Sequence, residues 1–511
     1  MTKTRTKFTR RDLLKGLASL PVLGLFGYLF YRKQKIHPVG SNRNLFEVQL
    51  PSRPATRSTV NNDRINLGVI GFGWRGESLS KSLGFAHPEW MKSSREAMEQ
   101  NPSNTRLKDF MEQEDLNVEI VAACDLYTPR NERARIISGN SDGPGALGRK
   151  PAGARIYKRY QDVLNDPDVD AVIISTHDHW HEKICLDAVS AGKHVYLEKC
   201  MGISLEQAKN IRDAVNNSPV TFQLGHQNHQ ITSHLIANRI IKEKKLGHIS
   251  LVQGSTDRFR KGGYSGYTDA SPETIDWDQY QEPLEIKRPF DPDRFFNWNS
   301  YFDYGLGLFG GLFSHEYAAI NQIMEMGIPD SLATVGGTYL WKENFEVPNV
   351  FGINLNYPGK DLMVMYSLNY GNSHLRKRLF IGTDAVMEAG NTVQVYPETN
   401  SEQYREHIQS GRADSDSPVY SWPREQIVDA VSSPTESFFL KKGVYFTYKD
   451  GRWVDSSHLH LKDWLEGIRY STKPACNVDM GFQETVTCTM ATKSYLEKRT
   501  VYWDPATETI I

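Results

Sequence analysis

Three glycines in the stretch RINLGVIGFGWRGE, residues 64–77, have the spacing of a turn that binds dinucleotide phosphates. Gly71, Gly73 and Gly76 follow the apolar run Ile65–Ile70 as G-x-G-x-x-G. In this fingerprint the first glycine allows a tight turn, the second lets the backbone approach a pyrophosphate, and the third lets the next helix pack on its strand. A helix beginning near Trp74 would direct its N-terminal amides toward the anion. We expect the phosphates at Gly71, Phe72, Gly73, Trp74, Arg75 and Gly76.

An acidic residue at the end of the next predicted strand indicates which dinucleotide binds. Asp125 directly follows the strand Val118–Cys124. A carboxylate at this place hydrogen-bonds the adenosine ribose and repels an additional phosphate there. It follows Gly76 by 49 residues rather than the usual ~20, because an insertion of about residues 84–116 precedes the strand. The sequence therefore favours NAD over NADP. For the glycine motif itself, the alternative interpretation is an ordinary glycine-rich turn.

The chain then alternates strands and helices. Strands are predicted at 169–176, 194–198 and 220–224, with helices at 180–191 and 204–215. Such alternation indicates a parallel sheet covered by helices on both faces, with ligands bound beyond the carboxyl ends of the strands. The polar residues that follow two of these strands are therefore predicted to contact the cofactor, and they include Thr176, His181, Glu198 and Lys199.

Three histidines within five residues raise the alternative of a metal centre. His177, His179 and His181 lie in the segment THDHWH, and imidazole is a common zinc ligand. Their spacing crosses a loop-to-helix turn, where the three side chains would diverge, and no thiolate or carboxylate set nearby completes a site. We predict no metal centre there.

The second half of the chain is predicted to be rich in strands of alternating pattern. A helix through Ile240 with Gly247 as its stop is followed by strands at 249–255, 331–340, 350–355, 361–368 and 377–381, and by closing helices at 460–470 and 481–496. The predicted architecture is an α/β Rossmann domain over residues 64–224 and an α+β domain over residues 225–511.

Composition separates this chain from nucleic-acid-binding proteins. The 511 residues are 39% hydrophobic and carry 60 basic and 61 acidic side chains, which gives a net charge of −1. Outside the N-terminus no segment concentrates Lys and Arg, so no nucleic-acid partner is expected. Aromatic residues mixed with Gly, Asp, Asn and Arg are dense between Arg258 and Tyr304, a composition common where sugars bind and equally common in aromatic cores.

The N-terminus is similar to a twin-arginine export signal. Thr9-Arg10-Arg11-Asp12-Leu13-Leu14 precedes an apolar run over residues 16–31 that ends in basic residues. We interpret residues 1–35 as a signal or membrane anchor and residues 36–63 as a linker, so the protein would be periplasmic or anchored facing the periplasm through residues 16–31. Five cysteines without C-x-x-C spacing argue against a disulfide framework.

Several motifs, in order, give the chain a resemblance to a known family from about Ile65 to Trp503. They are VIGFGWRG, VDAVIISTHDHWH, AGKHVYLEKCMGISLEQAK and GLGLFGGLFSHEYAAINQI, with HLHLKDWLEGIR and GFQETVTCTMATKSYLEKRTVYW near the end. The chain resembles the glucose–fructose oxidoreductase, inositol dehydrogenase and related (Gfo/Idh/MocA) oxidoreductases. The resemblance implies a Rossmann domain joined to a large, mainly antiparallel, open-faced sheet, and a homo-oligomer formed through that sheet.

The same resemblance implies two catalytic residues. Lys199 matches the family's E-K-P lysine and His315 its active-site histidine, and Cys200 replaces the proline. Oxidising an alcohol requires a base for the hydroxyl proton and a cation beside the developing oxyanion. The aspartates that the family pattern places four residues before and three after the histidine are Gly311 and Ala318 here, and Glu316 or Asp303 are the candidate replacements.

The implied activity is NAD(P)-dependent hydride transfer to or from a hydroxyl carbon of a sugar, cyclitol or glycoside. Nicotinamide cofactors are scarce outside the cytoplasm, so an exported member would carry a tightly held cofactor and restore it within each cycle. One alternative is a redox-assisted glycoside hydrolase or lyase that oxidises, eliminates and re-reduces. The other is a cofactor- or sugar-binding protein that lost catalysis with its aspartates.

Overall fold

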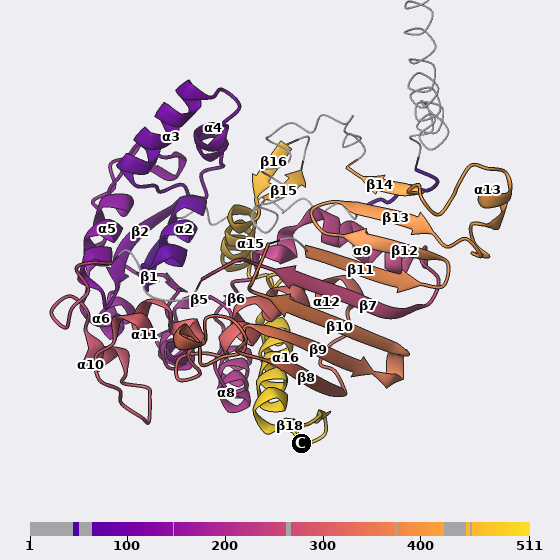
Figure 1. Cartoon of the computed structure of the whole chain (residues 1–511). Helices are drawn as coiled ribbons and strands as arrows, with labels where there is room; N and C mark the ends of the chain where they lie inside the picture. The colour runs from indigo at the N-terminus through magenta and orange to yellow at the C-terminus, as the bar shows by residue number, and fades with distance from the viewer. Residues whose placement is uncertain are drawn as a thin grey trace, which may run out of the picture.

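Two sheets organise the chain, which is described here from a computed structural model (Figure 1). The structure describes residues 44–50, 64–146, 148–261, 267–373, 376–423, 446–449 and 452–511. The first sheet, drawn in indigo and purple, lies in the N-terminal half, and the larger sheet, in magenta and orange, lies beside it. This arrangement confirms the predicted fold class.

The first sheet is parallel and has six strands in the order β3-β2-β1-β4-β5-β6. Its strands are β1 (Ile65–Ile70), β2 (Val118–Cys124), β3 (Arg155–Ile156), β4 (Ala171–Ile174), β5 (His194–Leu197) and β6 (Phe222–Leu224). The connecting helices are α2 (Trp74–Ser82), α5 (Thr128–Ser138), α6 (Tyr160–Asn165), α7 (His181–Ser190) and α8 (Leu205–Asn216). This strand order is that of a doubly wound dinucleotide-binding fold.

The predicted insertion between β1 and β2 contains two further helices. They are α3 (Pro88–Gln100) and α4 (Arg106–Met111), which pack together through Met91, Leu107 and Phe110. The insertion therefore has a small apolar core of its own and leaves the pairing of β1 with β2 intact.

The second sheet has ten strands in the order β14-β13-β12-β11-β7-β10-β9-β8-β17-β18. Among its described pairings only β7 with β10 is parallel. Its strands are β7 (Ile249–Asp257), β8 (Ser331–Gly337), β9 (Val350–Tyr357), β10 (Leu362–Asn369), β11 (Arg376–Gly382), β12 (Ala385–Ala389), β13 (Val393–Pro397), β14 (Tyr420–Trp422), β17 (Val501–Asp504) and β18 (Thr509–Ile510).

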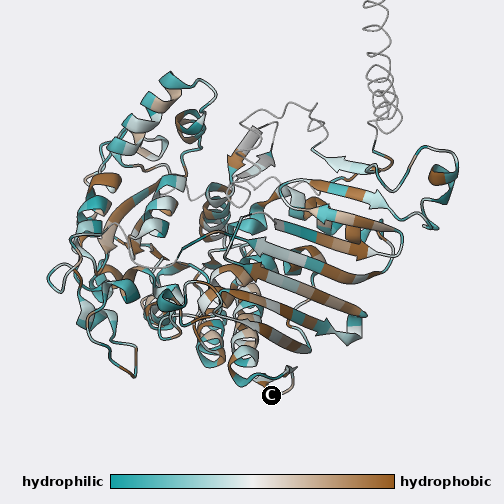
Figure 2. Cartoon of the chain, in the orientation of Figure 1, coloured by the Kyte–Doolittle hydropathy of each residue, from teal (hydrophilic) through white to brown (hydrophobic). Residues whose placement is uncertain are grey.

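In the described part of the chain, helices cover one face of this large sheet and leave the other open. Helices α9 (Thr232–Lys242), α12 (Ser314–Met324) and α16 (Val478–Glu497) lie against the covered face (Figure 1). Along β10 buried and exposed residues alternate, which is the pattern of a sheet with one wet face. Figure 2 shows both hydrophobic and hydrophilic residues along the strands of this sheet. Exposed apolar residues on the open face include Val335, Met363, Met365 and Tyr502.

A segment between β7 and α12 reaches back to the first sheet. It contains α10 (Trp277–Tyr280) and α11 (Pro292–Phe296). Ile275 forms a β-bridge with Tyr127, and the Asp276 amide donates to Leu126 O at 2.9 Å, just after β2. Several of the aromatic residues between Arg258 and Tyr304 form a separate buried cluster here, which also includes Tyr127. We call residues 267–304 the aromatic cover.

Several sequence predictions need correction. Helix α9 ends at Lys242 rather than at Gly247, because Lys244 already takes a left-handed φ of 55°. Strands β12, β13 and β14 were not predicted, nor was the hairpin of β15 (Phe446–Lys449) and β16 (Arg452–Asp455). The closing helices are longer than predicted, with α15 at Ser456–Tyr470.

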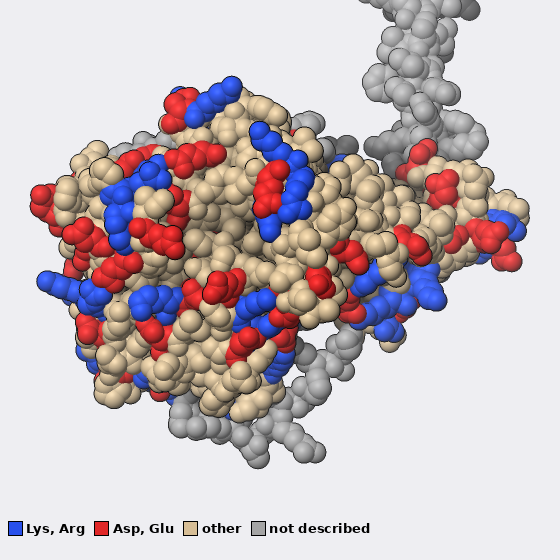
Figure 3. All heavy atoms as spheres, turned by 90° about the horizontal axis from the view of Figure 1, so that it is seen from below, with Lys and Arg blue, Asp and Glu red and all other residues tan. Residues whose placement is uncertain are grey.

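The predicted export signal, membrane tether and most of the linker lie outside the described residues. No helix in the described part of the chain is both long and apolar enough to cross a membrane. All five cysteines are buried and free. Acidic and basic side chains are interspersed on the face seen in Figure 3.

Candidate active site

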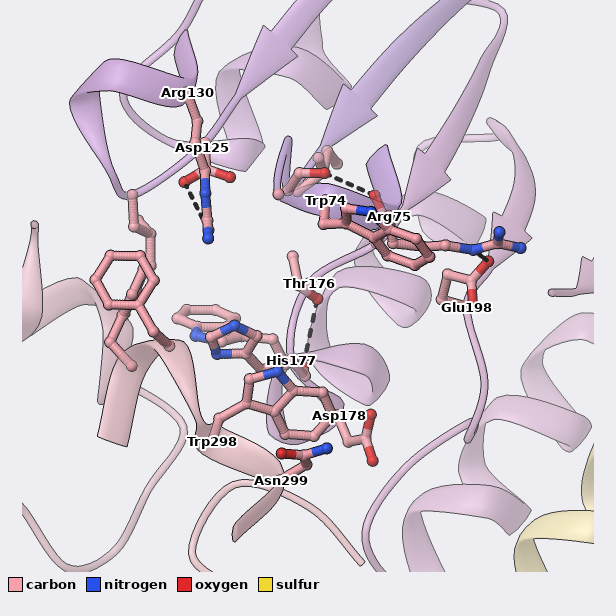
Figure 4. A pocket seen from close by; sticks show the side chains of 18 of the residues that line it. Trp74, Arg75, Asp125, Arg130, Thr176, His177, Asp178, Glu198, Trp298 and Asn299 are labelled. Carbon is pink, nitrogen blue, oxygen red and sulfur yellow. Dashed lines mark hydrogen bonds and ion pairs between the residues drawn. The ribbon is translucent and has the colours of Figure 1, made fainter. Parts of the chain in front are cut away.

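A cavity of about 540 Å³ opens beyond the carboxyl ends of β1, β2, β4 and β5. This volume falls within the usual range for small-ligand sites, roughly 300–1,000 Å³. The predicted residues that line it are Gly71, Gly73, Trp74, Arg75, Asp125, Thr176, Glu198, Lys199 and His315. In Figure 4, Asp125 with Arg130 and Arg75 with Glu198 flank an open space, and Trp298 and Asn299 of the aromatic cover lie near His177 and Asp178.

The glycine turn has the geometry that the fingerprint predicts. Gly71 has a φ of +85°, and a Cβ there would lie 2.7 Å from Ser175 O. A Cβ on Gly76 would lie 2.4 Å from Gly71 O, so the close contact between helix α2 and the turn requires glycine. Gly73 precedes α2 at its N-terminus. A dinucleotide phosphate fits the start of this helix.

Three predicted residues shape the site without lining the cavity. The Phe72 side chain is buried in the core of the first sheet. Its backbone amide donates a hydrogen bond to Asp125 Oδ2 at 2.6 Å and so helps to position that carboxylate. Gly76 packs against the turn. His181 is fully buried and its ring nitrogens contact Cys200 O and Thr176 O, so it joins the loops after β4 and β5.

The Asp125 carboxylate is fixed at its strand end. Besides the Phe72 amide, the Tyr127 amide donates to its Oδ1 at 2.8 Å. Arg130 lies 3.7 Å from the same carboxylate and stacks near the rings of Tyr127 and Phe296. The sequence analysis did not single out Arg130. Its position matters because an arginine near this place can accommodate a ribose phosphate.

Arg75 and Glu198 join the glycine turn to the loop after β5. Arg75 Nε lies 2.6 Å from Glu198 Oε1, and its Nη2 donates to Gln227 Oε1 at 3.2 Å. Both partners of this pair are mostly buried. Trp74 beside them is 69% exposed. A large apolar ring left in solvent at the cavity wall is available to a ligand.

Backbone carbonyls hold Lys199, and one of them belongs to Gly311, the position at which the family pattern has an aspartate. Its Nζ donates to Gly310 O at 2.6 Å and to Gly311 O at 3.3 Å. Both carbonyls belong to a π-helical turn, Phe309–Phe313, that leads into α12. Such turns are frequent at functional sites because they redirect backbone groups. The turn therefore orients the lysine toward the cavity without a carboxylate.

His315 has a different partner from those that the sequence suggested. Glu316 is paired with Arg378 at 2.6 Å, and Asp303 lies 2.8 Å from Arg294 and 3.1 Å from Arg288. Both candidate replacements are thus engaged elsewhere. The ring of His315 instead contacts the ring of His226.

His226 and Glu484 form a buried pair behind His315. The His226 and His315 rings are edge to face, with centroids 5.1 Å apart and planes at 89°. His226 Nε2 contacts Glu484 Oε2, and both side chains are at most 2% exposed. His226 follows β6, whereas Glu484 belongs to α16. Sequence reasoning missed this pair because the two residues are far apart in the chain.

Asp178 is another cavity residue that the sequence analysis did not select. It is buried, and burial raises the pKa of its carboxyl to about 8, against a smaller lowering by the charge of Lys199. Its Oδ2 lies beside Gly310, and the Gly310 carbonyl accepts a hydrogen bond from Lys199 Nζ. Near neutral pH the cavity therefore holds a protonated carboxyl close to the lysine.

The histidines of the THDHWH segment have separate partners. His177 Nδ1 lies 3.0 Å from Tyr280 Oη and its ring stacks on Trp298, and His179 Nε2 lies 2.9 Å from Tyr280 O. Burial lowers the pKa of His177 well below its usual range and that of His179 to about 4. His177 lines the cavity, and His179 anchors the aromatic cover.

Within the described residues, one cluster of side chains has the donor types of a metal site. It consists of Cys200, Glu484 and Cys488, all buried. Its thiols have other partners, since Cys488 Sγ lies 3.4 Å from Phe309 O and Cys200 Sγ 3.8 Å from Gly310 O. Burial raises the pKa of the Cys488 thiol. The contacts fit neutral thiols that donate to carbonyls of the π-helical turn.

Comparison with known proteins finds a family match over the residues that form the first sheet. Residues 65–226 match the family described as "Oxidoreductase family, NAD-binding Rossmann fold". Inositol 2-dehydrogenase of Salmonella typhimurium is 27% identical over 138 residues, which cover 27% of this chain and 38% of that protein. Levoglucosan dehydrogenase of Pseudarthrobacter phenanthrenivorans is 23% identical over 189 residues, covering 35% of this chain and 41% of that protein. The chain thus matches well under half the length of these relatives.

Solved structures resemble the chain over a longer range. An NAD binding oxidoreductase from Klebsiella pneumoniae has a TM-score of 0.56 at 19% identity, covering 86% of this chain and 99% of that one. Levoglucosan dehydrogenase in complex with NADH and levoglucosan has a TM-score of 0.56 at 14% identity, with the same coverage. At these identities the likeness concerns the fold, and it includes both sheets.

Proposed function

We propose that this chain, whose residues 65–226 match the Gfo/Idh/MocA oxidoreductase family, transfers hydride between NAD and a hydroxyl carbon of a sugar, cyclitol or glycoside. The observation that carries this proposal is a shared cavity. Lys199 and His315 line the same space as the glycine turn and Asp125. A cofactor held by its phosphates at that turn and a substrate hydroxyl near Lys199 would both fit.

In this proposal the two catalytic residues divide the work on the substrate hydroxyl. A bound nicotinamide would accept or return the hydride. His315 would take the hydroxyl proton, and Lys199 would place its ammonium beside the developing oxyanion. The carbonyls of Gly310 and Gly311 hold that ammonium in place, and the His226–Glu484 pair supports the His315 ring. Asp178 would add a proton donor near neutral pH.

NAD is the favoured cofactor. The Asp125 carboxylate ends β2, where it would accept from ribose hydroxyls and repel a phosphate. Arg130 offsets part of that charge from 3.7 Å. The remaining proposed contacts are those of Thr176 and Glu198 at the strand ends, with Arg75 bound to the latter.

The aromatic cover supports a tightly held cofactor. It bridges from Ile275 to Tyr127, directly after the strand that ends at Asp125. Tyr267 stacks on Phe296 with centroids 3.8 Å apart, and both line the cavity beside Arg130. A cofactor under this cover would be slow to exchange, which suits a protein exported through the proposed twin-arginine signal, whether cleaved or retained as a tether in residues 16–31.

A held cofactor also keeps redox-assisted glycoside cleavage as the second candidate function. The substrate itself must restore the cofactor when no exchange occurs. Oxidation to a ketone acidifies the neighbouring carbon, and elimination then needs an acid for the leaving group. Asp178, protonated up to about pH 8, is an acid in the right cavity.

We also propose a homo-oligomer formed through the open face of the large sheet. Val335 on β8 is 76% exposed, and Met363 and Met365 on β10 lie on the same face by register. Tyr502 on β17 extends this apolar surface and is 53% exposed. Such a surface is typical of a contact between subunits.

The test begins with the protein as purified. Mass spectrometry after denaturation should release stoichiometric NAD, and a panel of glycosides should show turnover. Lys199→Ala should lower kcat at least about 100-fold, the range for a positioned proton-transfer group. Lys193→Ala is the matched control, because Lys193 Nζ also donates to two carbonyls, those of Asp166 and Val169, outside the cavity.

The outcomes separate the hypotheses. Products that show net oxidation or reduction support the dehydrogenase, and cleaved glycosides without net redox change support the second candidate. Bound NAD without turnover of any substrate would support a binding protein. Absence of NAD, with no thermal shift on adding NAD or NADP, would refute the cofactor site.

A further inference from the structure

Two arginines enter the cavity from the strand at the centre of the large sheet. Arg258, Phe259 and Arg260 continue β7 as an extended segment, with the Arg258 amide donating to Asn369 O at 3.0 Å and the Arg260 amide to Tyr370 O at 3.3 Å. Alternate side chains of an extended segment point to the same side. Phe259 meets the Trp341 ring edge on, whereas both arginines line the cavity.

This segment extends a strand that packs against the helix of His315. Strand β7 runs against the start of α12, since a Cβ on Gly254 would lie 3.1 Å from Glu316 Cγ. His315 precedes Glu316 on that helix, and Arg258 follows Gly254 by four residues. The arginines therefore come from the same part of the fold as His315, whereas the glycine turn and Asp125 come from the first sheet.

Among the described residues, no acidic side chain balances the charges of these two arginines. Arg75 and Arg130, the other arginines of the cavity, lie beside Glu198 and Asp125. In the described part of the chain no carboxylate lies within ion-pair distance of Arg258 or Arg260. The remaining cavity carboxyl, Asp178, carries a proton near neutral pH. Two guanidinium groups without a described carboxylate partner, together with Lys199, make the lining of this cavity cationic.

We propose that the substrate is an anionic sugar, of the uronic acid class, whose carboxylate is bound by Arg258 and Arg260. Guanidinium forks bind carboxylates with paired, charge-assisted hydrogen bonds. An acid group held there would fix the sugar ring in the cavity that also contains Lys199 and His315. This inference deepens the proposed function and rests on the same cavity.

Matched substrates and variants test it. The kcat/KM for a glucuronide should be at least about 10-fold higher than that for the corresponding glucoside, which is the size of effect expected from hydrogen bonds to charged groups. The Arg258→Gln, Arg260→Gln double variant should lose about 10- to 100-fold in kcat/KM for the glucuronide and keep its kcat/KM for the glucoside. Lys261→Gln is the control, because Lys261 is the next residue, is exposed and does not line the cavity. Circular dichroism checks that the variants fold.

A binding measurement makes the result independent of turnover. Calorimetric titration with sodium glucuronate should give binding that the double variant loses and Lys261→Gln keeps, and titration with glucose should give weaker binding. If no sugar is turned over but this pattern holds, the proposed function fails and the anion site stands. Equal use of glucoside and glucuronide, unchanged by the double variant, would overturn the inference. A sugar sulfate preferred over the glucuronide would overturn its assignment to a carboxylate.

Discussion

The carboxyl of Asp178 makes the stability of the protein depend on pH. Its pKa is raised from 3.8 to about 8 by burial, so between these values the folded state binds one proton more than the unfolded state. The contribution of this group to stability then falls as pH rises through this window, by up to about 1.4 kcal/mol per pH unit. Above pH 8 the loss is complete and the slope disappears.

Replacing that carboxyl tests the argument at the residue scale. Asp178→Asn keeps the shape and removes the titration, so its stability relative to the natural protein should increase steadily from pH 4 to pH 8 and stay constant above. Urea unfolding curves of both proteins at a series of pH values, with the same cofactor content, measure the difference. Parallel curves across the window would contradict a raised pKa at this site.

At the scale of elements, the His226–Glu484 pair links the loop after β6 to helix α16 behind His315. Removing one partner from a buried pair costs roughly 3–5 kcal/mol, because the other is left without compensation. Glu484→Gln should therefore lower stability. If the pair also positions His315, kcat should fall about 10-fold or more while KM and bound NAD stay unchanged.

A second buried carboxylate provides the control for this prediction. Glu316 follows His315 on α12 and is as buried as Glu484, but it pairs with Arg378 away from the cavity. Glu316→Gln should lose comparable stability and keep its kcat. Equal losses of kcat in both variants would assign a structural role to the His226–Glu484 pair.

The same element scale shows what the sequence can predict and what it cannot. Gly71, Gly73 and Asp125 were found because a strand, a turn and a strand end are local patterns, even across the insertion. The His226–Glu484 pair behind His315 could not be found in this way, because Glu484 lies on a helix 258 residues after His226. The carbonyls that hold Lys199 were missed because no side chain marks a π-helical turn.

At the scale of the whole molecule, the aromatic cover joins the two halves of the chain over one end of the cavity. It belongs to the connection between β7 and α12, yet it pairs with residues that follow β2. Lys199 comes from the first sheet and His315 from the helices of the second. We therefore expect that a cofactor under the cover leaves more readily when the contacts of the cover with Tyr127 and Arg130 break.

Phe296 is the residue that tests this coupling. Its ring stacks on Tyr267 and lies 5.4 Å from the Arg130 guanidinium, and together such contacts contribute about 1–3 kcal/mol. Phe296→Ala should release bound NAD about 10-fold faster, measured by transfer to a scavenging dehydrogenase, and should contain less NAD as purified. Phe290→Ala is the control, since Phe290 packs on Trp277 in the same cover without lining the cavity. Equal retention in both variants would mean that the cover does not hold the cofactor.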